Sequence, residues 1–371
     1  MKITIVTGPF FASPPAPCGA VERLWQQLAV QFAQRRHSVT MVGRSDPSCP
    51  TEQTIDGVRI LRHGGFPQTS FIALDLLTDF LYSLRQVRHI PASDIIITNA
   101  FWLPFLLTHL FRRHTPVLPT IGTMPKGQIF LYLRCSRLLA PSRAVKKAIE
   151  RQSPGAAGMV AVVPNPIDLN YFKPPTPPRD FTGAKQILFA GRIHPGKNVL
   201  MLVRAFASLA RQRSDVFLKI MGPWERHRGG GGQAYRDEIL RLSKGLPVEL
   251  CPAIYDRAEL AAQFQQAHLF CLPSAMEAFG VAPLEAMATG AVPVVSTIDA
   301  FVELIPNDVG YFFDQASPDA VSNLAGAINQ SLQSIGELSA RSERAAKVAS
   351  DYGIANIASG YLEVFEQVMQ Q

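Results

Sequence analysis

The chain alternates short apolar segments with amphipathic segments, and it does so in two separate series. Such an alternation predicts strands of a parallel sheet with helices packed on its faces. In the first series we expect strands at residues 2–7, 38–42, 58–62, 94–99, 116–121, 137–140 and 159–163. In the second we expect them at residues 186–190, 217–221, 248–251, 269–272, 292–296 and 310–313. The pattern therefore indicates an α/β protein with two doubly wound domains.

A proline-rich stretch, "NPIDLNYFKPPTPPRDFTGAK", separates the two series. Its prolines prevent a continuous helix and are typical of a linker. We therefore predict an N-terminal domain at residues 1–168 and a C-terminal domain at 169–350, followed by a helix within 351–371. A chain of 371 residues is also more typical of two domains than of one.

Composition narrows the class of protein. The chain is 47% hydrophobic and 18% charged, which is typical of a globular protein, and no apolar run approaches the roughly 20 residues of a membrane-spanning helix. The first residues, "MKITIVTGPFF", break at Gly8 and Pro9, so they predict a buried strand and not a signal peptide. Five cysteines without a C-x-x-C pair argue against a disulfide scaffold or a zinc site. We expect a cytoplasmic protein.

The segment "SAMEAFGVAPLEAMATG" (residues 274–290) places Glu277 and Glu285 eight residues apart around a predicted loop and helix start. Pro283 suits the first helical position and Gly290 the position after the helix end. Free amides at a helix N-terminus favour phosphate, and the two carboxylates can accept hydrogen bonds from hydroxyls. This combination suits a nucleotide sugar. The alternative is structural, because a glutamate in a first helical turn is favoured by the helix dipole alone.

A second segment, "ILFAGRIHPGKNVLMLVRAFASL" (residues 187–209), contains two cations after a predicted strand. The strand ends at Gly191, Arg192 follows, and Lys197 comes just before an amphipathic helix. Arg192 offers a planar fork of donors and Lys197 a compact charge, so together they suit a departing diphosphate. The alternative is that both are solvated surface residues.

Several segments together resemble one family. They are "CGAVERLWQQLAVQFAQRRHSVTMV" (18–42), "VVPNPIDLNYF" (162–172), "AGRIHPGKN" (190–198), "IMGPW" (220–224) and "LPSAMEAFGVAPLEAMATGAVPVVST" (272–297). The sequence is similar to the retaining glycosyltransferases of family four, the glycosyl transferases group 1. The resemblance implies a GT-B architecture, in which two Rossmann-like domains face each other across a donor and acceptor cleft. It also implies that the final helix, within 351–371, packs back on the N-terminal domain.

The same resemblance implies roles for individual residues. Arg192 and Lys197 would hold the donor diphosphate, Glu285 the ribose hydroxyls and Glu277 the transferred sugar, so that Arg192, Lys197 and Glu277 form the catalytic set. The other donor-binding residues would be Gly19, Asn165, Gly191, Phe279, Gly280 and Val281. No cofactor or metal ligand is expected, since the chain has no D-x-D triplet. The donor would be a UDP or GDP sugar, and transfer would retain the anomeric configuration.

Charge is divided unevenly along the chain. Residues 1–175 contain 19 Lys and Arg against nine Asp and Glu, a net charge of +10, and the remainder has a net charge of −3. In GT-B enzymes the N-terminal half generally receives the acceptor. We therefore expect an anionic or lipid-linked acceptor, or contact with an anionic membrane surface, and no nucleic acid. The densest basic run comprises Arg112, Arg113, Arg134, Arg137, Arg143, Lys146, Lys147 and Arg151.

Two stretches interleave apolar and basic residues, namely "FIALDLLTDFLYSLRQVRHI" (71–90) and "FLYLRCSRLL" (130–139). Either could lie in a membrane interface. The alternative, which we favour for any single helix, is an ordinary amphipathic helix with its apolar face buried. A third stretch, "RHRGGGGQAY" (226–235), predicts a flexible loop because of its four glycines.

The chain also departs from the family pattern. Gly122 and Thr123 stand where many relatives have a histidine near the reacting sugar, and Pro252 replaces a common glycine near the base. Two other functions stay open on these grounds: a non-catalytic sugar-nucleotide binder and a sugar-nucleotide epimerase. A nicotinamide-dependent dehydrogenase is disfavoured, because no G-x-G-x-x-G follows the first strand.

Overall fold

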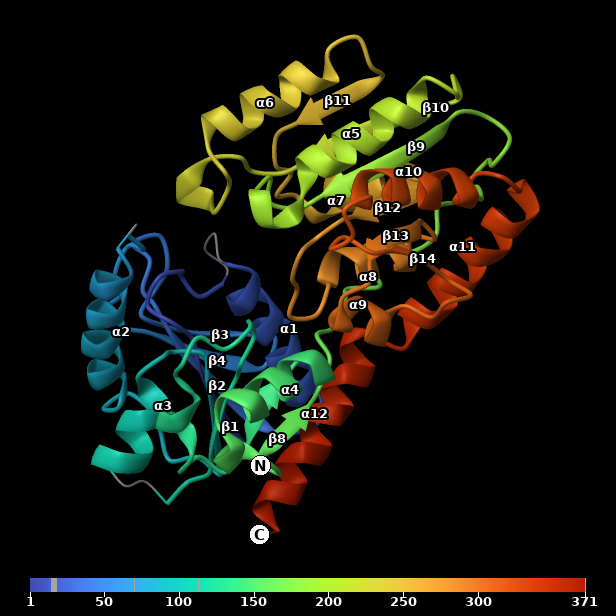
Figure 1. The fold of residues 1–371 in the computed structure, drawn as a ribbon. Coiled ribbons are helices and arrows are strands. Elements are labelled where there is room, and N and C mark those ends of the chain that lie inside the picture. The colour runs from blue at the N-terminus through green and yellow to red at the C-terminus, as the bar shows by residue number, and fades with distance from the viewer. Residues whose placement is uncertain (15–18, 70, 112–113, 371) are drawn as a thin grey trace. The chain divides into compact units, whose positions relative to one another are not determined.

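The structure is a computed structural model that describes residues 1–14, 19–69, 71–111 and 114–370. The chain forms two compact units, shown as a ribbon in Figure 1. Unit 1 comprises Met1–Pro166 and Ile354–Gln371, and unit 2 comprises Ile167–Gly353.

Unit 1 is built on a six-stranded sheet with the order β3-β4-β2-β1-β5-β6. Its strands are β1 (Lys2–Val6), β2 (Ser38–Gly43), β3 (Glu52–Ile55), β4 (Val58–Arg62), β5 (Ile95–Thr98) and β6 (Val117–Pro119). All neighbours are parallel except β3, which pairs antiparallel with β4. The first strand is almost fully buried, as expected for the centre of a doubly wound sheet.

Two features of unit 1 differ from the sequence-based prediction. The hairpin strand β3 was missed, because none of its residues is buried and three of the four are polar. The last two predicted strands, β7 (Leu138–Ala140) and β8 (Val160–Val162), form a separate two-stranded parallel sheet. A single bridge from Thr120 to Leu139 links that pair to the end of β6.

The helices of unit 1 are α1 (Ala20–Gln34), α2 (Ile72–Gln86), α3 (Leu103–Phe105), which continues into a π-helical turn at Leu106–Leu110, α4 (Arg143–Gln152) and α12 (Ile354–Met369). The C-terminal helix α12 packs against α1. The rings of Trp25 and Tyr361 meet edge to face with centroids 5.2 Å apart, and Arg35 donates a 2.7 Å hydrogen bond to the carbonyl of Ala355. Aromatic contacts and a backbone acceptor therefore hold α12 in unit 1.

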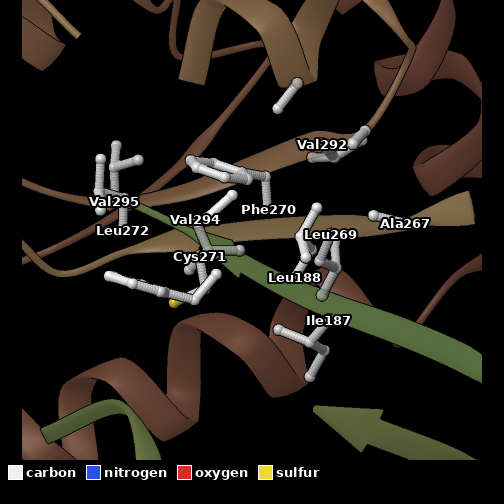
Figure 2. Close-up of a cluster of buried hydrophobic side chains, with 14 of the residues drawn as sticks. Ile187, Leu188, Ala267, Leu269, Phe270, Cys271, Leu272, Val292, Val294 and Val295 are labelled. Carbon is white, nitrogen blue, oxygen red and sulfur yellow. The ribbon is translucent and has the colours of Figure 1, made fainter. Parts of the chain in front are cut away.

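Unit 2 has a wholly parallel sheet with the order β11-β10-β9-β12-β13-β14. The strands are β9 (Lys185–Ala190), β10 (Val216–Met221), β11 (Val248–Cys251), β12 (Leu269–Leu272), β13 (Val292–Ser296) and β14 (Tyr311–Phe313). Figure 2 shows how side chains of the central strands, among them Leu188, Phe270 and Val294, pack into one apolar cluster. Strands buried on both faces are typical of a parallel sheet covered by helices on each side.

The helices of unit 2 are α5 (Val199–Ala210), α6 (Gln233–Ser243), α7 (Arg257–Gln266), α8 (Val281–Ala288), α9 (Asp299–Leu304), α10 (Ala320–Ser331) and α11 (Ile335–Ser350). Helix α5 packs beside α10, and α8 beside α11. Within the described residues, no helix is both long and apolar enough to cross a bilayer.

The glycine-rich stretch before α6 is more ordered than predicted. The amides of Gly230, Gly231 and Gly232 donate hydrogen bonds to the carbonyls of Glu225, Ile193 and Trp224, respectively. A Cβ on Gly230 would collide with the backbone of Trp224. The glycines are therefore required by close backbone approach, and the expected flexible loop is a compact turn.

The two stretches that interleave apolar and basic residues also differ from the favoured prediction. Residues 130–139 do not form an amphipathic helix, since a short 3₁₀ turn at Ile129–Tyr132 leads directly towards β7. The other stretch does form a helix, α2, but most of its aliphatic residues are exposed, and three of its four buried residues are the polar Asp79, Ser83 and Gln86. The alternative of a buried apolar face is thus wrong for α2.

Candidate functional site

The loop from β9 to α5 places the predicted diphosphate-binding cations. Arg192 follows Gly191 and is exposed, and its guanidinium lies so close to Gly229 that a Cβ there would be 2.9 Å from Nη1. Lys197 ends a single 3₁₀ turn, Pro195–Lys197. That turn is capped by His194, whose Nδ1 accepts a 3.0 Å hydrogen bond from the Gly196 amide. His194 therefore shapes the loop that carries both cations.

The loop from β12 to α8 places the predicted sugar-binding residues. Gly280 precedes α8 with φ +113°, and a Cβ there would lie 2.9 Å from the ring of Phe301, so only glycine fits. The first hydrogen bond of the helix runs from the Leu284 amide to the Gly280 carbonyl. The helix geometry consequently leaves the amides of Gly280, Val281 and Ala282 without acceptors inside the helix.

Helix α8 begins two residues earlier than predicted. Pro283 is the third helical residue and not the first, because the helix already begins at Val281. Proline is still tolerated there, since an amide in the first turn has no intrahelical acceptor to lose. Gly290 does follow the helix end, with φ +77°. Phe279 is buried and its ring lies 6.1 Å from that of Tyr352, centroid to centroid.

Direct hydrogen bonds join the two loops. The Asn198 side chain donates to the Pro273 carbonyl at 2.9 Å, and the Ala275 amide donates to the Gly196 carbonyl at 3.1 Å. Asn198 has a left-handed conformation, φ +51°, which asparagine tolerates better than most residues. Since β9 and β12 are neighbouring strands, their carboxyl ends bring these loops to one edge of the sheet.

Lys197 and Glu277 meet at this junction. The Lys197 Nζ forms an ion pair with Glu277 Oε1, and the side chains are only 18% and 16% exposed. The Ser274 hydroxyl donates a 2.8 Å hydrogen bond to the same carboxylate oxygen. A charge pair this sheltered from water is held more firmly than a surface pair. The structure thus brings together two residues that the sequence singled out separately.

Glu285 is positioned by a residue that the sequence did not indicate. Its Oε1 lies 3.9 Å from Arg257 Nη2, and both side chains are largely buried. The Arg257 guanidinium in turn lies over the rings of Tyr171 and Phe172, 5.6 and 5.0 Å from their centroids. These cation–π contacts fix the arginine and, through it, the carboxylate. No local sequence signal marks Arg257, because all its partners are distant in sequence.

Two of the predicted donor-binding residues belong to unit 1. Asn165 lies between β8 and the unit boundary and is half-buried. Gly19 precedes α1, and a Cβ there would collide with the carboxylate of Glu22 and lie 3.1 Å from the Phe11 ring. An added Cβ would therefore force the side chains of Glu22 and Phe11 to shift. The remaining predicted site residues all lie in unit 2.

Unit 1 contains a cavity of about 340 Å³ at the carboxyl ends of β1, β5 and β6. Its lining includes Asn99, Thr120, Gly122 and Thr123. Asn99 Oδ1 accepts hydrogen bonds from Trp25 Nε1 and from the Thr120 hydroxyl, while its buried Nδ2 makes no hydrogen bond to any of the described residues. The two hydrogen bonds to Oδ1 thus fix the orientation of the Asn99 amide, and its NH₂ group can donate to a ligand. A Cβ on Gly122 would meet no atom within 4 Å.

The cavity has one carboxylate and no cation among its described lining residues. Asp79 accepts hydrogen bonds from the amides of Phe101 and Trp102 at 3.1 and 2.9 Å. Burial raises the pKa of Asp79 above its usual range. Part of the basic charge predicted for this half lies elsewhere, on α4, where Arg143, Lys146 and Lys147 line a second hollow. Arg112 and Arg113, from the same basic run, lie outside the described residues.

Comparison with known proteins assigns the family. A family model described as glycosyl transferases group 1 matches residues 177–348, and one described as Glycosyltransferase Family 4 matches residues 21–171. The chain belongs to glycosyltransferase family 4. The resemblance of the sequence to this family is confirmed.

This family-4 glycosyltransferase is similar to curated proteins over nearly its whole length. It is 26% identical to the D-inositol 3-phosphate glycosyltransferase of Kineococcus radiotolerans, with 99% of this chain and 95% of that one covered. It is 27% identical to the lipopolysaccharide 1,2-N-acetylglucosaminetransferase of Salmonella typhimurium, with 98% and 97% covered.

Solved structures confirm the predicted fold class. The glycosyltransferase chain superposes on sucrose-phosphate synthase from Thermosynechococcus elongatus with a TM-score of 0.80 at 18% identity over all of both chains. It also superposes on an Anabaena protein in complex with UDP and glucose, with a TM-score of 0.72 at 18% identity over 99% of each chain. The architecture is GT-B, with two Rossmann-like units.

Proposed function

We propose that this protein is a retaining, nucleotide-sugar-dependent glycosyltransferase that moves a hexose-type sugar to an acceptor hydroxyl. The observation that carries the proposal is the junction of the β9–α5 and β12–α8 loops, where Lys197 pairs with Glu277, together with the first amides of α8, which have no acceptor inside the helix. Cations and amides suit the diphosphate of a donor, and carboxylates suit hydroxyls. This arrangement fits a nucleotide sugar better than it fits a diphosphate alone or a sugar alone.

The donor would be divided among the residues of the unit 2 site. Arg192 and Lys197 bind the diphosphate oxygens, together with the amides near Phe279, Gly280 and Val281. Glu285, held by Arg257, accepts hydrogen bonds from the ribose hydroxyls. Glu277 accepts them from the transferred sugar, and Gly191 allows the ligand to approach the strand end.

Catalysis in this proposal is electrostatic. As the bond between the anomeric carbon and the diphosphate oxygen breaks, negative charge grows on the leaving group, and Arg192 and Lys197 stabilise it. The acceptor hydroxyl oxygen bonds to the anomeric carbon on the face that the diphosphate leaves, and its proton passes to the departing phosphate oxygen. Configuration is thereby retained. The two cations replace the metal ion that D-x-D-containing transferases use.

Lys197 changes partner in this scheme. Without donor, its charge is neutralised by Glu277. A bound diphosphate offers Lys197 a stronger anionic partner, and Glu277 then becomes free to accept hydrogen bonds from the sugar. The ion pair therefore holds both side chains in place and neutralises their charges until the donor binds.

For the acceptor, we propose a lipid-linked or anionic molecule whose reacting part is an uncharged polyol or sugar. The unit 1 cavity supports the second half of this statement, because its described lining carries hydroxyl and amide groups and no cation. The charged or lipid part would lie outside this cavity. Two relatives support such acceptors by name, one acting on an inositol phosphate and one on lipopolysaccharide. Gly19 and Asn165, which the resemblance implies as further donor-binding residues, both belong to unit 1.

As the nucleotide of the donor we favour UDP over GDP, since a solved structure of the same fold holds UDP and glucose. The test is incubation of UDP and GDP sugars with a panel of polyol, inositol phosphate and lipid-linked acceptors, with the product linkage read by NMR. An α-linked product from an α-linked donor supports retention. An inverted product overturns that part of the proposal.

One observation favours a second candidate, a non-catalytic sugar-nucleotide binder. Gly122 and Thr123 give the cavity no ionisable group at the position where a histidine is common in the family. Saturable donor binding without transfer to any acceptor, and without hydrolysis, would support this alternative. Conversion of the donor sugar into its epimer would instead indicate an epimerase.

A further inference from the structure

Helix α2 of unit 1 buries a polar face and exposes an apolar one, the reverse of an ordinary surface helix. Its buried residues are Asp79, Tyr82, Ser83 and Gln86, whereas four of its five leucines are exposed. In Figure 1, α2 lies at the outer edge of unit 1. A helix of a globular domain normally buries the opposite set.

Specific hydrogen bonds fix this orientation. Asp79 accepts from the amides of Phe101 and Trp102, and Gln86 Nε2 donates to the His63 carbonyl at 2.8 Å. The Trp102 indole donates to the Leu76 carbonyl at 3.0 Å. Turning the leucines inwards would break these bonds and bury polar groups without partners. The apolar face is therefore a permanent outer surface.

The exposed apolar residues form a stripe three and four positions apart. Phe71 and Ile72, at the N-terminal end, are 73% and 76% exposed, and Leu77 in the middle is 54% exposed. The stripe as a whole comprises Phe71, Ile72, Leu74, Leu77, Leu81 and Leu84. Residues at this spacing line one side of a helix. Contiguous apolar surface of this kind marks an interaction site.

The charges on the stripe are both positive. Arg85 and Arg88 are exposed at its C-terminal end. Neither carboxylate of α2 faces outwards with them, because Asp79 is buried and Asp75 accepts hydrogen bonds from the amide and hydroxyl of Thr69. Unit 1 as a whole carries 18 Lys and Arg against ten Asp and Glu, a net charge of +8. The partner of this surface must therefore be apolar and negatively charged.

We infer that α2 docks unit 1 on the interface of an anionic bilayer. The leucines and Phe71 insert at the boundary between headgroups and acyl chains, and Arg85 and Arg88 reach the lipid phosphates. The helix lies on the membrane and does not cross it.

A second copy of the chain fits the stripe less well. Two α2 helices packed in parallel would oppose Arg85 and Arg88 with the same arginines. Packed antiparallel, they would set both arginines against Phe71 and Ile72. Neither arrangement supplies a carboxylate, so the positive charges would be uncompensated. A bilayer with anionic headgroups supplies the complement to both parts of the surface.

The test is co-sedimentation of the full chain with vesicles of phosphatidylcholine alone and of phosphatidylcholine mixed with phosphatidylglycerol. We expect binding to the mixed vesicles, weakened by salt. Leu77→Gln with Leu81→Gln should lower that binding by about tenfold or more, because two leucines lose their insertion. Arg85→Gln with Arg88→Gln should also lower it by about tenfold.

The matched control is Leu240→Gln with Val302→Gln, two exposed apolar residues of unit 2, which should bind like the wild type. Thermal unfolding verifies that every variant is folded.

Light scattering tests whether a second copy of the chain covers the stripe instead, since a dimer that the Leu77/Leu81 variant abolishes would overturn the membrane proposal. Absence of binding to the mixed vesicles, or equal binding by the leucine variant, would overturn it as well. Nucleotide binding measured without vesicles stays a separate readout of the proposed function, on which this inference does not depend.

Discussion

The Lys197 ammonium and the Glu277 carboxylate form an ion pair across 80 residues of sequence. The pair exists because the loops after β9 and β12 meet at one edge of the unit 2 sheet and are tied by Asn198. It makes each partner's position depend on the other.

Lys197→Ala should lower kcat by about a hundredfold or more, because one of two cations facing the leaving diphosphate is lost. The free energy of unfolding should fall by only about 1–2 kcal/mol, since Glu277 keeps its bond to Ser274. Lys219→Ala is the control: Lys219, itself 16% exposed, forms an ion pair at 3.3 Å with the more exposed Glu249, away from the loops. Turnover and urea unfolding of both variants check this, and equal losses of turnover would contradict the assignment.

Arg257→Ala should weaken nucleotide binding by about fivefold to tenfold through Glu285, without contacting the ligand itself. The double variant with Glu285→Ala should then bind hardly worse than Glu285→Ala alone. Calorimetric titration of the three variants measures the coupling. Fully additive losses would show that Arg257 does not act through Glu285.

Gly280→Ala should destabilise unit 2 by about 2–4 kcal/mol, because φ is +113° and the new methyl group meets Phe301. Gly326→Ala, within α10 and with no atom within 4 Å of the added Cβ, should instead stabilise by about 0.5–1 kcal/mol. Denaturant unfolding of both variants gives the comparison. A neutral effect of Gly280→Ala would mean that the loop adapts.

Glu22 gives a pH-dependent prediction for unit 1. Burial raises the pKa of its carboxyl above the ordinary value of 4.5. The stabilisation from the neutral form is therefore complete below pH 4.5 and is lost as the pH rises through the folded-state pKa. Relative to Glu22→Gln, the wild type should lose stability over that rise. Unfolding free energies at a series of pH values test this, and a constant difference would contradict it.

The sequence predicts the strands of unit 2 to within one residue at each end, because strands buried on both faces appear as apolar runs. The edge strand β3 has no such run. Its signal was the pair Asp56 and Gly57, both with positive φ, which is typical of a tight hairpin turn. That turn would have indicated the antiparallel pairing of Ile55 with Val58.

Periodicity alone could not determine which face of α2 is buried. The leucine spacing predicts an amphipathic helix, but the inward face was decided by Asp79 and its two backbone donors, which come from a distant segment. The same limit applies to Arg257, whose contacts with Glu285 and Phe172 arise only in the folded unit. Within the site, the sequence identifies candidates whose local spacing is regular, and the fold supplies the residues that position them.

Calorimetric titration with UDP, GDP and ADP and their common hexose conjugates tests directly whether the unit 2 site binds a nucleotide sugar. It should be performed on the wild type, on Glu285→Ala and on the exposed control Glu259→Ala. We expect saturable binding of one nucleotide, which is lost in Glu285→Ala and kept in Glu259→Ala. If the wild type binds none of these ligands, or if Glu285→Ala binds as tightly as the wild type, the proposed donor site is wrong.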